Sequence, residues 1–587
     1  MKLPFAFTLI CLTAGRLPAQ TADAMLASFF RDQLDASFQL RPAAATSLGE
    51  HRYDDRLDDL TPTARARWLE QTRAALAALP QRVDRAGLTH AGQIDYDIFE
   101  HDLQKRIWLT ENFDPYVTDP RVYSQYISGA VYDLLAQSSL PHEVNVSNAI
   151  ARIRQLPTVC AAARVNLQNP PSVCVETAIK QNQGAIRFYE HDIFTIAGDT
   201  QQLAELKAAA AAGLPVLKDY QTFLETDLLP RSNGEWRIGN DKFSRKLELE
   251  LDAGLTADQV YADAQTEFQR VRNDMYVIAR QLWSGCFARA ALPADDADGR
   301  RATVEAVLQH IAQDCSTSAT LVGDVRDAVE RVKQFITARD IIRLPQPDLC
   351  RVIEMPEFQR GNSTAFMKSP PPLDASAVGF YAVSPPPQDW DAPRVHSYFA
   401  EYNRSMLQIL TIHEAYPGHY VQLEYANRNP SLIRKVLGSG AFIEGWAVYT
   451  EQMMLDQGYG DGDLALRLTQ LKFYLRAVVN AILDHRMQCE AMTDAQAMDL
   501  LVNQSFQSEG EARLKVIRAK QSSVQLSTYF TGRMGHYRLR QQIARELGDQ
   551  FDLGRYHAAV LANGSIPLKF LPELVRAQLG LGGTAKP

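Results

Sequence analysis

The sequence predicts a mainly α-helical protein, built as one large multi-helix unit with two lobes and a small β-sheet. Apolar residues recur at three- and four-residue spacing over most of the 587 residues, which is the period of an amphipathic helix. Strand-like runs are few and lie in the middle of the chain. A hydrophobic content of 46% and a charged content of 22% are typical of a soluble globular protein with a large core.

The N-terminus has the features of a secretory signal peptide. Residues 1–20 contain one early lysine, an apolar run of signal-peptide length and small residues downstream, with cleavage expected between Ala19 and Ala24. The run is too short for a membrane span, which needs about 20 apolar residues. Cys11 follows Ile10, a poor lipoprotein signal. We therefore expect a soluble periplasmic or secreted protein, with a lipid anchor as the less favoured alternative.

Removal of the signal peptide leaves an even number of cysteines, namely Cys160, Cys174, Cys286, Cys315, Cys350 and Cys489. In an oxidising compartment these allow up to three disulfides, and the closest pairs in sequence are Cys160 with Cys174 and Cys286 with Cys315. Buried free thiols are the alternative in a protein of this size. None of the cysteines has the CxxC spacing of a metal or redox site.

Helical patterns dominate the first part of the chain. We assign residues 21–240 to an N-terminal helical lobe and residues 241–587 to a metal-containing catalytic lobe, as parts of one continuous fold. The acidic stretch 47–60 lacks the glycine and the terminal glutamate of a calcium-binding EF-hand loop, so it is interpreted as a solvated loop. His51, within it, is assigned to the scaffold.

The strand-like segments are 242–251, 351–355, 363–367 and 378–383. Two or three of them are expected to form a small sheet before the helix that carries the proposed metal ligands. Further helices are predicted at 394–412, 431–456, 462–490, 494–521 and 537–549.

A metal-binding pattern follows the strand-like region. The segment T-I-H-E-A-Y-P-G-H-Y-V-Q places His413, Glu414 and His419 within seven residues, and Glu444 follows 25 residues after His419. Two imidazoles and a distant carboxylate are the ligands of a catalytic zinc ion that keeps one position open for water. The sequence therefore predicts one zinc ion per chain, held by His413, His419 and Glu444, with Glu414 as the base that deprotonates the water.

The histidine spacing also predicts an irregular backbone. His413 and His419 are six residues apart, about 240° around an ideal helix, so a regular helix would point them in different directions. Pro417 cannot donate a backbone hydrogen bond, and Gly418 tolerates unusual dihedral angles. We expect a bulge or local unwinding here that returns His419 to the face of His413.

These motifs resemble a known family. H-E-A-Y-P-G-H-Y-V-Q followed by E-G-W-A-V-Y-T-E resembles the signature of the bacterial domain of unknown function 885 family, whose members resemble α-helical zinc peptidases. The first motif is also similar to an expanded form of the HExxGH motif of dipeptidyl peptidase III. Two C-terminal stretches, at 525–533 and 551–567, are similar to later blocks of the 885 family. The resemblance implies a zinc-peptidase-like hydrolase with a deep cleft, but it supplies no substrate.

Other residues are assigned supporting roles. Glu451 lies seven residues after Glu444 on the same helix face and could accept a hydrogen bond from a ligand histidine, with a surface salt bridge as the alternative. Gln422 is a weaker candidate for the same role. By resemblance, Tyr529 or His557 would stabilise the oxyanion, unless both are simply packed.

Two residues are assigned to substrate binding. Arg533 would receive a substrate carboxylate if the enzyme trims C-termini. An edge strand in zinc peptidases can hold an extended substrate by backbone hydrogen bonds, and 378–383, with Tyr381, is the candidate. A sheet that only packs is the alternative.

We therefore predict an exported zinc-dependent hydrolase that cleaves short peptides. A zinc-dependent amidase or deacylase acting on a small non-peptide molecule, and a non-catalytic metal-containing binding protein, are the alternatives. The net charge of −8 and the lack of a basic run argue against nucleic acid as a partner. No G-x-S-x-G motif of a serine hydrolase occurs.

Overall fold

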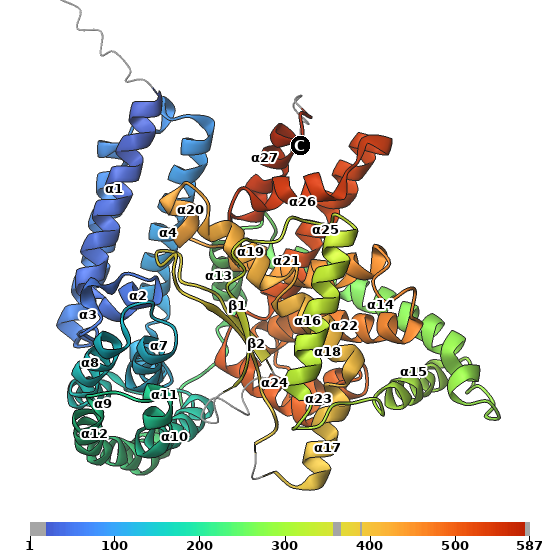
Figure 1. The fold of residues 1–587 in the computed structure, drawn as a ribbon, viewed down its shortest axis with the longest axis horizontal. Helices are drawn as coiled ribbons and strands as arrows, with labels where there is room; N and C mark the ends of the chain where they lie inside the picture. Colours follow the sequence, from blue (N-terminus) through green and yellow to red (C-terminus); the bar gives the residue numbers. More distant parts are fainter. Residues whose placement is uncertain (1–18, 356–364, 388–389, 582–587) are drawn as a thin grey trace, which may run out of the picture.

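The computed structural model describes residues 19–355, 365–387 and 390–581, and it is mainly α-helical as predicted (Figure 1). The predicted signal peptide lies almost wholly outside the described residues. Figure 1 shows the N-terminal helices on one side, the C-terminal helices on the other and the small sheet between them.

The helices of the first part of the chain are α1 (Ala19–Leu40), α2 (Pro42–Ser47), α3 (Pro62–Arg82), α4 (His90–Asn112), α5 (Pro115–Thr118), α6 (Val122–Ser124), α7 (Ala130–Ala136), α8 (His142–Ile153), α9 (Leu156–Asn166), α10 (Ser172–Arg187), α11 (Ile193–Ala197), α12 (Leu203–Phe223) and α13 (Gly239–Leu251). The helices that follow, before the sheet, are α14 (Ala257–Cys286), α15 (Ala297–Ile311) and α16 (Leu321–Ala338). Short 3₁₀ and π segments are η1 (His51–Tyr53), η2 (Arg85–Gly87), η3 (Gln125–Gly129), η4 (Phe188–Asp192), η5 (Leu224–Leu228), η6 (Leu229–Arg231), η8 (Gly548–Gln550) and η9 (Leu568–Phe570).

After the sheet come α17 (Ala392–Glu401), α18 (Arg404–Glu414), α19 (His419–Asn427), α20 (Leu432–Val436), α21 (Gly440–Asp456), α22 (Leu464–Cys489), α23 (Asp494–Val502), α24 (Glu509–Gln521), α25 (Ser527–Leu547), α26 (Leu553–Leu561) and α27 (Leu571–Gln578). The predicted helices 394–412, 431–456 and 494–521 are each divided in two. Side-chain caps start the second helix of each pair: Asn403 accepts a hydrogen bond from the Met406 N–H, and Ser439 and Ser508 cap α21 and α24.

Buried side chains form two hydrophobic cores. The smaller core lies within residues 43–228, among helices such as α8, α10 and α12. The larger core joins α1, α3 and α4 to the helices from α13 onward, so that Phe30 and Phe99 belong to the same core as Leu475. The chain thus leaves the larger core after α4 and returns to it at α13, near the predicted boundary at residue 240.

The small sheet has three strands, β1 (Cys350–Glu354), β2 (Ala365–Lys368) and β3 (Gly379–Val383), in the order β1-β3-β2. β1 is parallel to β3 and β2 is antiparallel to it, with Tyr381 paired to both Val352 and Met367. These strands match three of the predicted segments. The fourth prediction, a strand at 242–251, is wrong because this segment is α13, in which Phe243, Leu247 and Leu251 recur at four-residue spacing and are buried.

The predicted edge strand is also wrong. β3 is the central strand, so its backbone groups face strands on both sides and cannot hold a substrate. Tyr381 is fully buried, and its hydroxyl lies 3.3 Å from the Thr411 hydroxyl of α18. Tyr381 therefore attaches the sheet to α18 instead of contacting substrate, and β2 is the edge strand on the side of the site.

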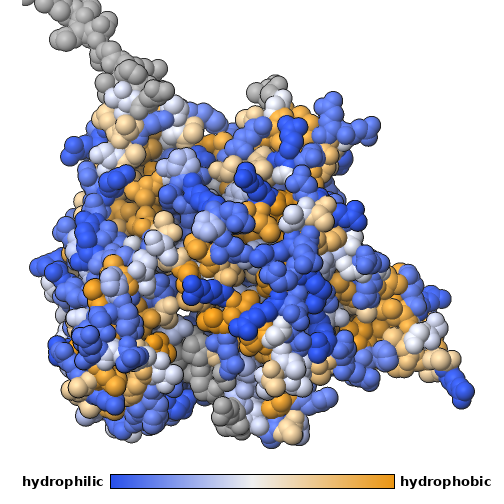
Figure 2. All heavy atoms as spheres, viewed as in Figure 1, coloured by the Kyte–Doolittle hydropathy of each residue, from blue (hydrophilic) through white to orange (hydrophobic). Residues whose placement is uncertain are grey.

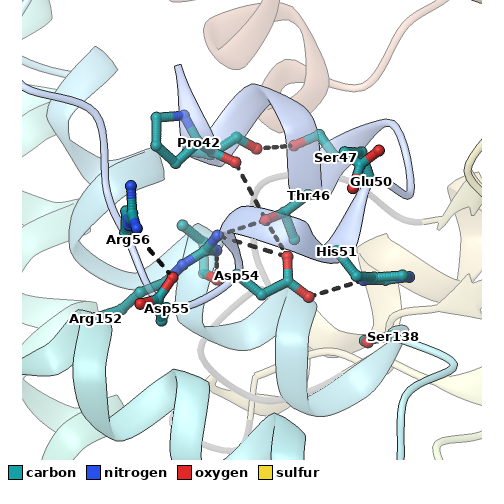
Figure 3. A network of polar contacts seen from close by, with 12 residues as sticks. Pro42, Thr46, Ser47, Glu50, His51, Asp54, Asp55, Arg56, Ser138 and Arg152 are labelled. Carbon is teal, nitrogen blue, oxygen red and sulfur yellow. Dashed lines mark hydrogen bonds and ion pairs between the residues drawn. The ribbon is translucent and has the colours of Figure 1, made fainter. Parts of the chain in front are cut away.

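A buried polar network connects α2 and the segment after it to Arg152 of α8 (Figure 3), and His51 links it to Asp374 in the loop after β2. The stretch predicted as a solvated loop contains Asp54, which is only 1% exposed and accepts a hydrogen bond from Thr46. His51 lies between two carboxylates, with Nδ1 2.8 Å from Asp54 and Nε2 3.1 Å from Asp374. Arg152, fully buried, donates to Thr46 and to the Ala130 carbonyl. This network fixes the loop that connects β2 to β3.

The six cysteines within the described residues are unbonded thiols. Of the two alternatives, the structure has the free thiols, and neither Cys160–Cys174 nor Cys286–Cys315 is a disulfide. Burial raises the pKa of the Cys160 and Cys174 thiols to about 12, which keeps them protonated.

The visible face of the molecule is mostly hydrophilic, with apolar side chains gathered where α14 and α15 leave the body (Figure 2). Within the described ranges, no helix is both long enough and apolar enough to cross a bilayer.

Candidate metal centre

The predicted irregularity between the two histidines is present. α18 ends at Glu414 and α19 begins at His419, with a cis peptide bond between Tyr416 and Pro417 in the break. A Cβ atom on Gly418 would lie 1.9 Å from the His413 carbonyl oxygen, so only glycine allows the chain to fold back this closely. The Trp446 indole N–H donates to the Pro417 carbonyl at 2.8 Å and holds the break in place.

This break brings the three predicted ligands together. The rings of His413 and His419 have their centroids 4.8 Å apart. The Nε2 atom of His419 lies 3.3 Å from Glu444 Oε2, and that of His413 lies 4.0 Å from the same oxygen. One ligand atom from each residue lies within 4.8 Å of the others, although the residues come from three different helices.

The chemistry of these atoms fits a zinc ion. Zinc is bound at about 2.0–2.2 Å, so tetrahedral ligands lie roughly 3.3–3.6 Å apart. The 3.3 Å separation of His419 from Glu444 falls in this range, and the 4.0 Å separation of His413 from Glu444 is slightly longer. Burial, with the nearby His419, lowers the pKa of His413 to about 3, so its imidazole is the neutral form that binds metal. Burial acts to raise the pKa of Glu444, but His419 outweighs it and the carboxyl is held ionised.

Glu451 occupies the predicted supporting position. Its Oε1 atom lies 2.7 Å from His413 Nδ1, and the side chain is 1% exposed. With the proton between His413 Nδ1 and Glu451, the Nε2 atom of His413 has a free lone pair on the side of Glu444, as a metal ligand requires. Burial holds the pKa of Glu451 well above its usual value, and Arg533 and Arg476 oppose that shift.

Glu414 is buried beside the same cluster. Burial raises the pKa of its carboxyl to about 7, while His419 and the backbone N–H of Met367 favour the ionised form. Met367 belongs to β2, so the edge strand approaches the carboxylate directly. β2 and β3 show the same local sequence pattern, so the sequence could not indicate which of them is the edge strand beside the site. Only the strand order distinguishes them.

Tyr529 lies near Glu444 of the cluster. Its hydroxyl oxygen accepts hydrogen bonds from Arg518 Nη2 at 3.0 Å and from Gln525 Nε2 at 3.3 Å. Burial raises the pKa of Tyr529, with the charge of Glu444 acting in the same direction, which places the ring near that ligand. Arg518 was missed by the sequence analysis, because an arginine on an amphipathic helix carries no distinguishing signal.

His557 does not have the predicted catalytic role. Its Nε2 lies 2.8 Å from the Tyr449 hydroxyl and its Nδ1 lies 2.9 Å from the Ile341 carbonyl, so both ring nitrogens are engaged. The side chain is fully buried and packs against Trp446. His557 therefore supports the core behind the centre, and the oxyanion role remains only for Tyr529.

Arg533 and Gln422 are also structural. Arg533 is 2% exposed, lies between the rings of Tyr474 and Tyr537 and donates to Gln452 Oε1. It therefore cannot receive a substrate carboxylate. Gln422 donates to the Ser565 hydroxyl at 2.7 Å instead of contacting a ligand histidine.

A cavity of about 260 Å³ lies beyond β2, between the two parts of the molecule. Met367 and Lys368 of β2 form one wall, and the opposite side includes His51 and Asp133. The predicted deep cleft at the metal ligands is not confirmed, because this cavity lies beside the edge strand.

Comparisons with known proteins agree with the motifs. A putative lipoprotein of unknown function from Shewanella oneidensis has 30% sequence identity and a TM-score of 0.77, over 93% of this chain and 99% of that one. A putative lipoprotein from Colwellia psychrerythraea shares the fold at 18% identity and a TM-score of 0.79, over 96% of this chain and all of that one. No curated protein matches the chain. The family model for a bacterial protein of unknown function (DUF885) matches residues 42–575, so this chain belongs to the DUF885 family.

Proposed function

We propose that this protein is a zinc-dependent hydrolase that cleaves peptide bonds in short peptides. The observation that carries the proposal is the meeting of His413, His419 and Glu444 beside the buried carboxyl of Glu414. A buried His-His-Glu set with an adjacent carboxylate is the arrangement of a catalytic site more than of a structural one.

The three ligand residues would hold the ion, with His413 oriented by Glu451. Bound zinc supplies Lewis acidity, which polarises a carbonyl group and makes water acidic near neutral pH. Glu414 accepts the proton of the attacking water and delivers it to the leaving amine. Its pKa of about 7 suits both transfers, because the carboxyl can take up and release a proton at neutral pH.

Tyr529 is suited to stabilise the negative charge that develops on the carbonyl oxygen. Arg518 and Gln525 both donate to its oxygen, so the hydroxyl proton remains available for a third partner. A fixed donor of this kind lowers the barrier because it needs no reorganisation during the reaction.

The edge strand supports a peptide substrate over a small amide. β2 pairs only with β3, and the N–H of Met367 is directed to the other side, toward Glu414. An extended peptide can pair with such an edge and continue into the cavity beside Lys368.

We also propose that the protein is exported to the periplasm or secreted. The N-terminal sequence has the features of a signal peptide, and the two similar solved structures are described as putative lipoproteins.

The test is the metal content of the purified protein by elemental analysis, together with digestion of a peptide library. We expect about one zinc per chain in the wild type and the loss of both zinc and cleavage in His419→Ala. His142→Ala, a substitution of an exposed histidine, is the control. Retention of zinc by the His419 variant would disprove the ligand set, and zinc without peptide cleavage in the wild type would favour an amidase or a binding protein.

A further inference from the structure

A group of positively charged side chains lies on α22 and α24. α22 contributes Lys472 and Arg476, one turn apart, and α24 contributes Lys515 and Arg518 on one helix face. Glu511, one turn before Lys515, lies on the same face of α24.

Two of these cations are already paired. The Lys472 ammonium lies 2.9 Å from Glu401 Oε2, and Arg476 Nη2 lies 2.9 Å from Glu511 Oε2. The second oxygen of Glu511 accepts a hydrogen bond from the Tyr402 hydroxyl at 2.8 Å. Both carboxylates are therefore paired with α22 cations, and in the described residues neither forms an ion pair with Lys515 or Arg518.

Lys515 is the more deeply buried of the two α24 cations. It is only 8% exposed, and within the described part of the chain no hydrogen bond or ion pair reaches its ammonium group. Burial, together with the charges of Arg476 and Arg518, holds the pKa of Lys515 well below its usual value. Burial of an ammonium without a counter-ion is costly and favours the neutral amine, whereas a bound anion would restore the charged form, so the position is suited to receive an anion.

Arg518 has no carboxylate partner of its own in the described residues. Its guanidinium contacts two uncharged groups, Gln525 Oε1 at 2.7 Å and the Tyr529 hydroxyl at 3.0 Å. Arg476 likewise keeps a buried Nη1 atom without a hydrogen bond, since Glu401 Oε1 is 3.9 Å away.

These cations lie next to the metal centre. The ring of Phe473 has its centroid 5.7 Å from that of His413 and 5.4 Å from the guanidinium carbon of Arg476. On the other side, Arg518 bonds directly to Tyr529. The two separations on the Phe473 side, 5.7 and 5.4 Å, place the Arg476 guanidinium carbon at most 11.1 Å from the His413 ring centroid. An extended peptide covers about 3.3–3.6 Å per residue, so about three residues at most span that distance.

We propose that Lys515 and Arg518 receive the C-terminal carboxylate of a peptide substrate, so that the enzyme is a carboxypeptidase-type exopeptidase that releases one to three residues. This inference rests on the proposed function. Water adds across the scissile bond: its oxygen joins the carbonyl carbon, and its protons end on the new carboxyl group and the released amine. Lys515 and Arg518 would thus bind the substrate carboxylate that was predicted to contact Arg533, which is buried.

The chemistry favours a carboxylate over an uncharged group. A guanidinium presents parallel N–H donors that match the two oxygens of a carboxylate, and a lysine beside it adds a mobile charge. Charge-assisted contacts of this kind also place a short peptide in one direction, with its C-terminus on α24.

The experiment compares N-acetylated tetra-alanine with a free C-terminal acid and with a C-terminal amide. For the zinc-loaded wild type, we expect kcat/KM to be roughly 10–100-fold higher for the acid. In Lys515→Met and Arg518→Gln this preference should shrink to nearly equal rates. Arg513→Met, an exposed α24 residue paired with Glu509, should keep the full preference.

Two readouts do not depend on turnover. Lys515→Met removes a buried amino group whose ionisation is opposed by burial and by Arg476 and Arg518, so its Tm should rise, whereas Arg513→Met should leave the Tm almost unchanged. Calorimetric binding of the acid peptide to the Glu414→Gln protein should weaken about 10-fold or more when Lys515→Met is added.

The outcomes separate the two proposals. If both peptides are cleaved at equal rates by the wild type, the carboxylate subsite is wrong while the hydrolase stands. If neither is cleaved, preferential binding of the acid that requires Lys515 would still support the anion subsite, and equal binding of acid and amide would overturn it.

Discussion

Gly445 and Gly532 meet backbone to backbone where α21 crosses α25. A Cβ atom on Gly445 would lie 2.3 Å from the Gly532 Cα atom, closer than any real side-chain contact. α21 carries Glu444 and Glu451, and α25 carries Tyr529, so this contact sets the distance between the proposed ligand Glu444 and the proposed oxyanion donor Tyr529. It explains why glycine stands in both the E-G-W and the T-G-R motifs.

Gly445→Ala should therefore destabilise the protein and disturb the centre. Forcing the helices apart costs about 1–3 kcal/mol and shifts Glu444 relative to the histidines. We expect a lower Tm and a lower zinc content. Gly440→Ala is the matched control on α21, because its Cβ would meet only the Thr528 methyl group at 3.6 Å. Equal Tm values for the two variants would contradict the close-contact explanation.

Glu451→Ala should weaken zinc binding while the fold is kept. Loss of the 2.7 Å contact to Nδ1 frees the His413 ring to rotate and change tautomer. The expected loss is about 10–100-fold in zinc affinity, measured by competition with a chelator. Glu451→Gln keeps an acceptor oxygen and should lose less. An unchanged affinity in the alanine variant would show that His413 is oriented by packing alone.

Glu414→Gln should retain zinc and lose about 10²–10⁴-fold in kcat. A base must be ionised to act, so the wild-type rate falls as the pH falls through the pKa of Glu414. Burial sets that pKa at about 7, and a bound cation lowers it, so kcat/KM should have an acid limb with its midpoint at or below pH 7. The residual activity of the glutamine variant should lack this limb, and persistence of the same limb would assign it to another group.

Tyr529→Phe should lower kcat by about 10²–10³-fold with little change in KM, because it removes a donor needed in the transition state. Zinc content should stay at the wild-type value. If Tyr529→Phe raised KM and left kcat unchanged, Tyr529 would have a role in substrate binding instead.

His51 should stabilise the protein in a pH-dependent way. The hydrogen bond that protonated His51 donates to Asp54, together with the one it donates to Asp374, raises its pKa to about 9, above the ordinary 6.5. Its contribution is therefore complete below pH 6.5 and is lost as the pH rises through 9. His51→Gln should lower stability by about 1–2 kcal/mol at pH 6, given that the ring is 20% exposed, and by less at pH 10. His142→Gln, at an exposed position, is the control, and equal losses at both pH values would exclude the charged contact.

The sequence by itself determined the helical class, the position of the small sheet, the three residues proposed as metal ligands and the break between His413 and His419. These features are local: helical periodicity follows from neighbouring residues, and Pro417 with Gly418 interrupts the helix wherever it packs. The position of Glu451 beside the cluster could also be predicted, because it lies seven residues after Glu444, two turns along the same helix face.

Tertiary structure alone decided the remaining roles, because they depend on partners far away in the chain. β3 and β2 look alike in sequence, but only the pairing order makes β2 the edge beside Glu414. His557 is occupied by the Ile341 carbonyl, 216 residues away, whereas Tyr529 keeps a free proton. Likewise, nothing in the sequence distinguishes Lys515 from other helix lysines. It is buried because α22 packs against α24, and the nearby carboxylates Glu401 and Glu511 form ion pairs with Lys472 and Arg476 of α22.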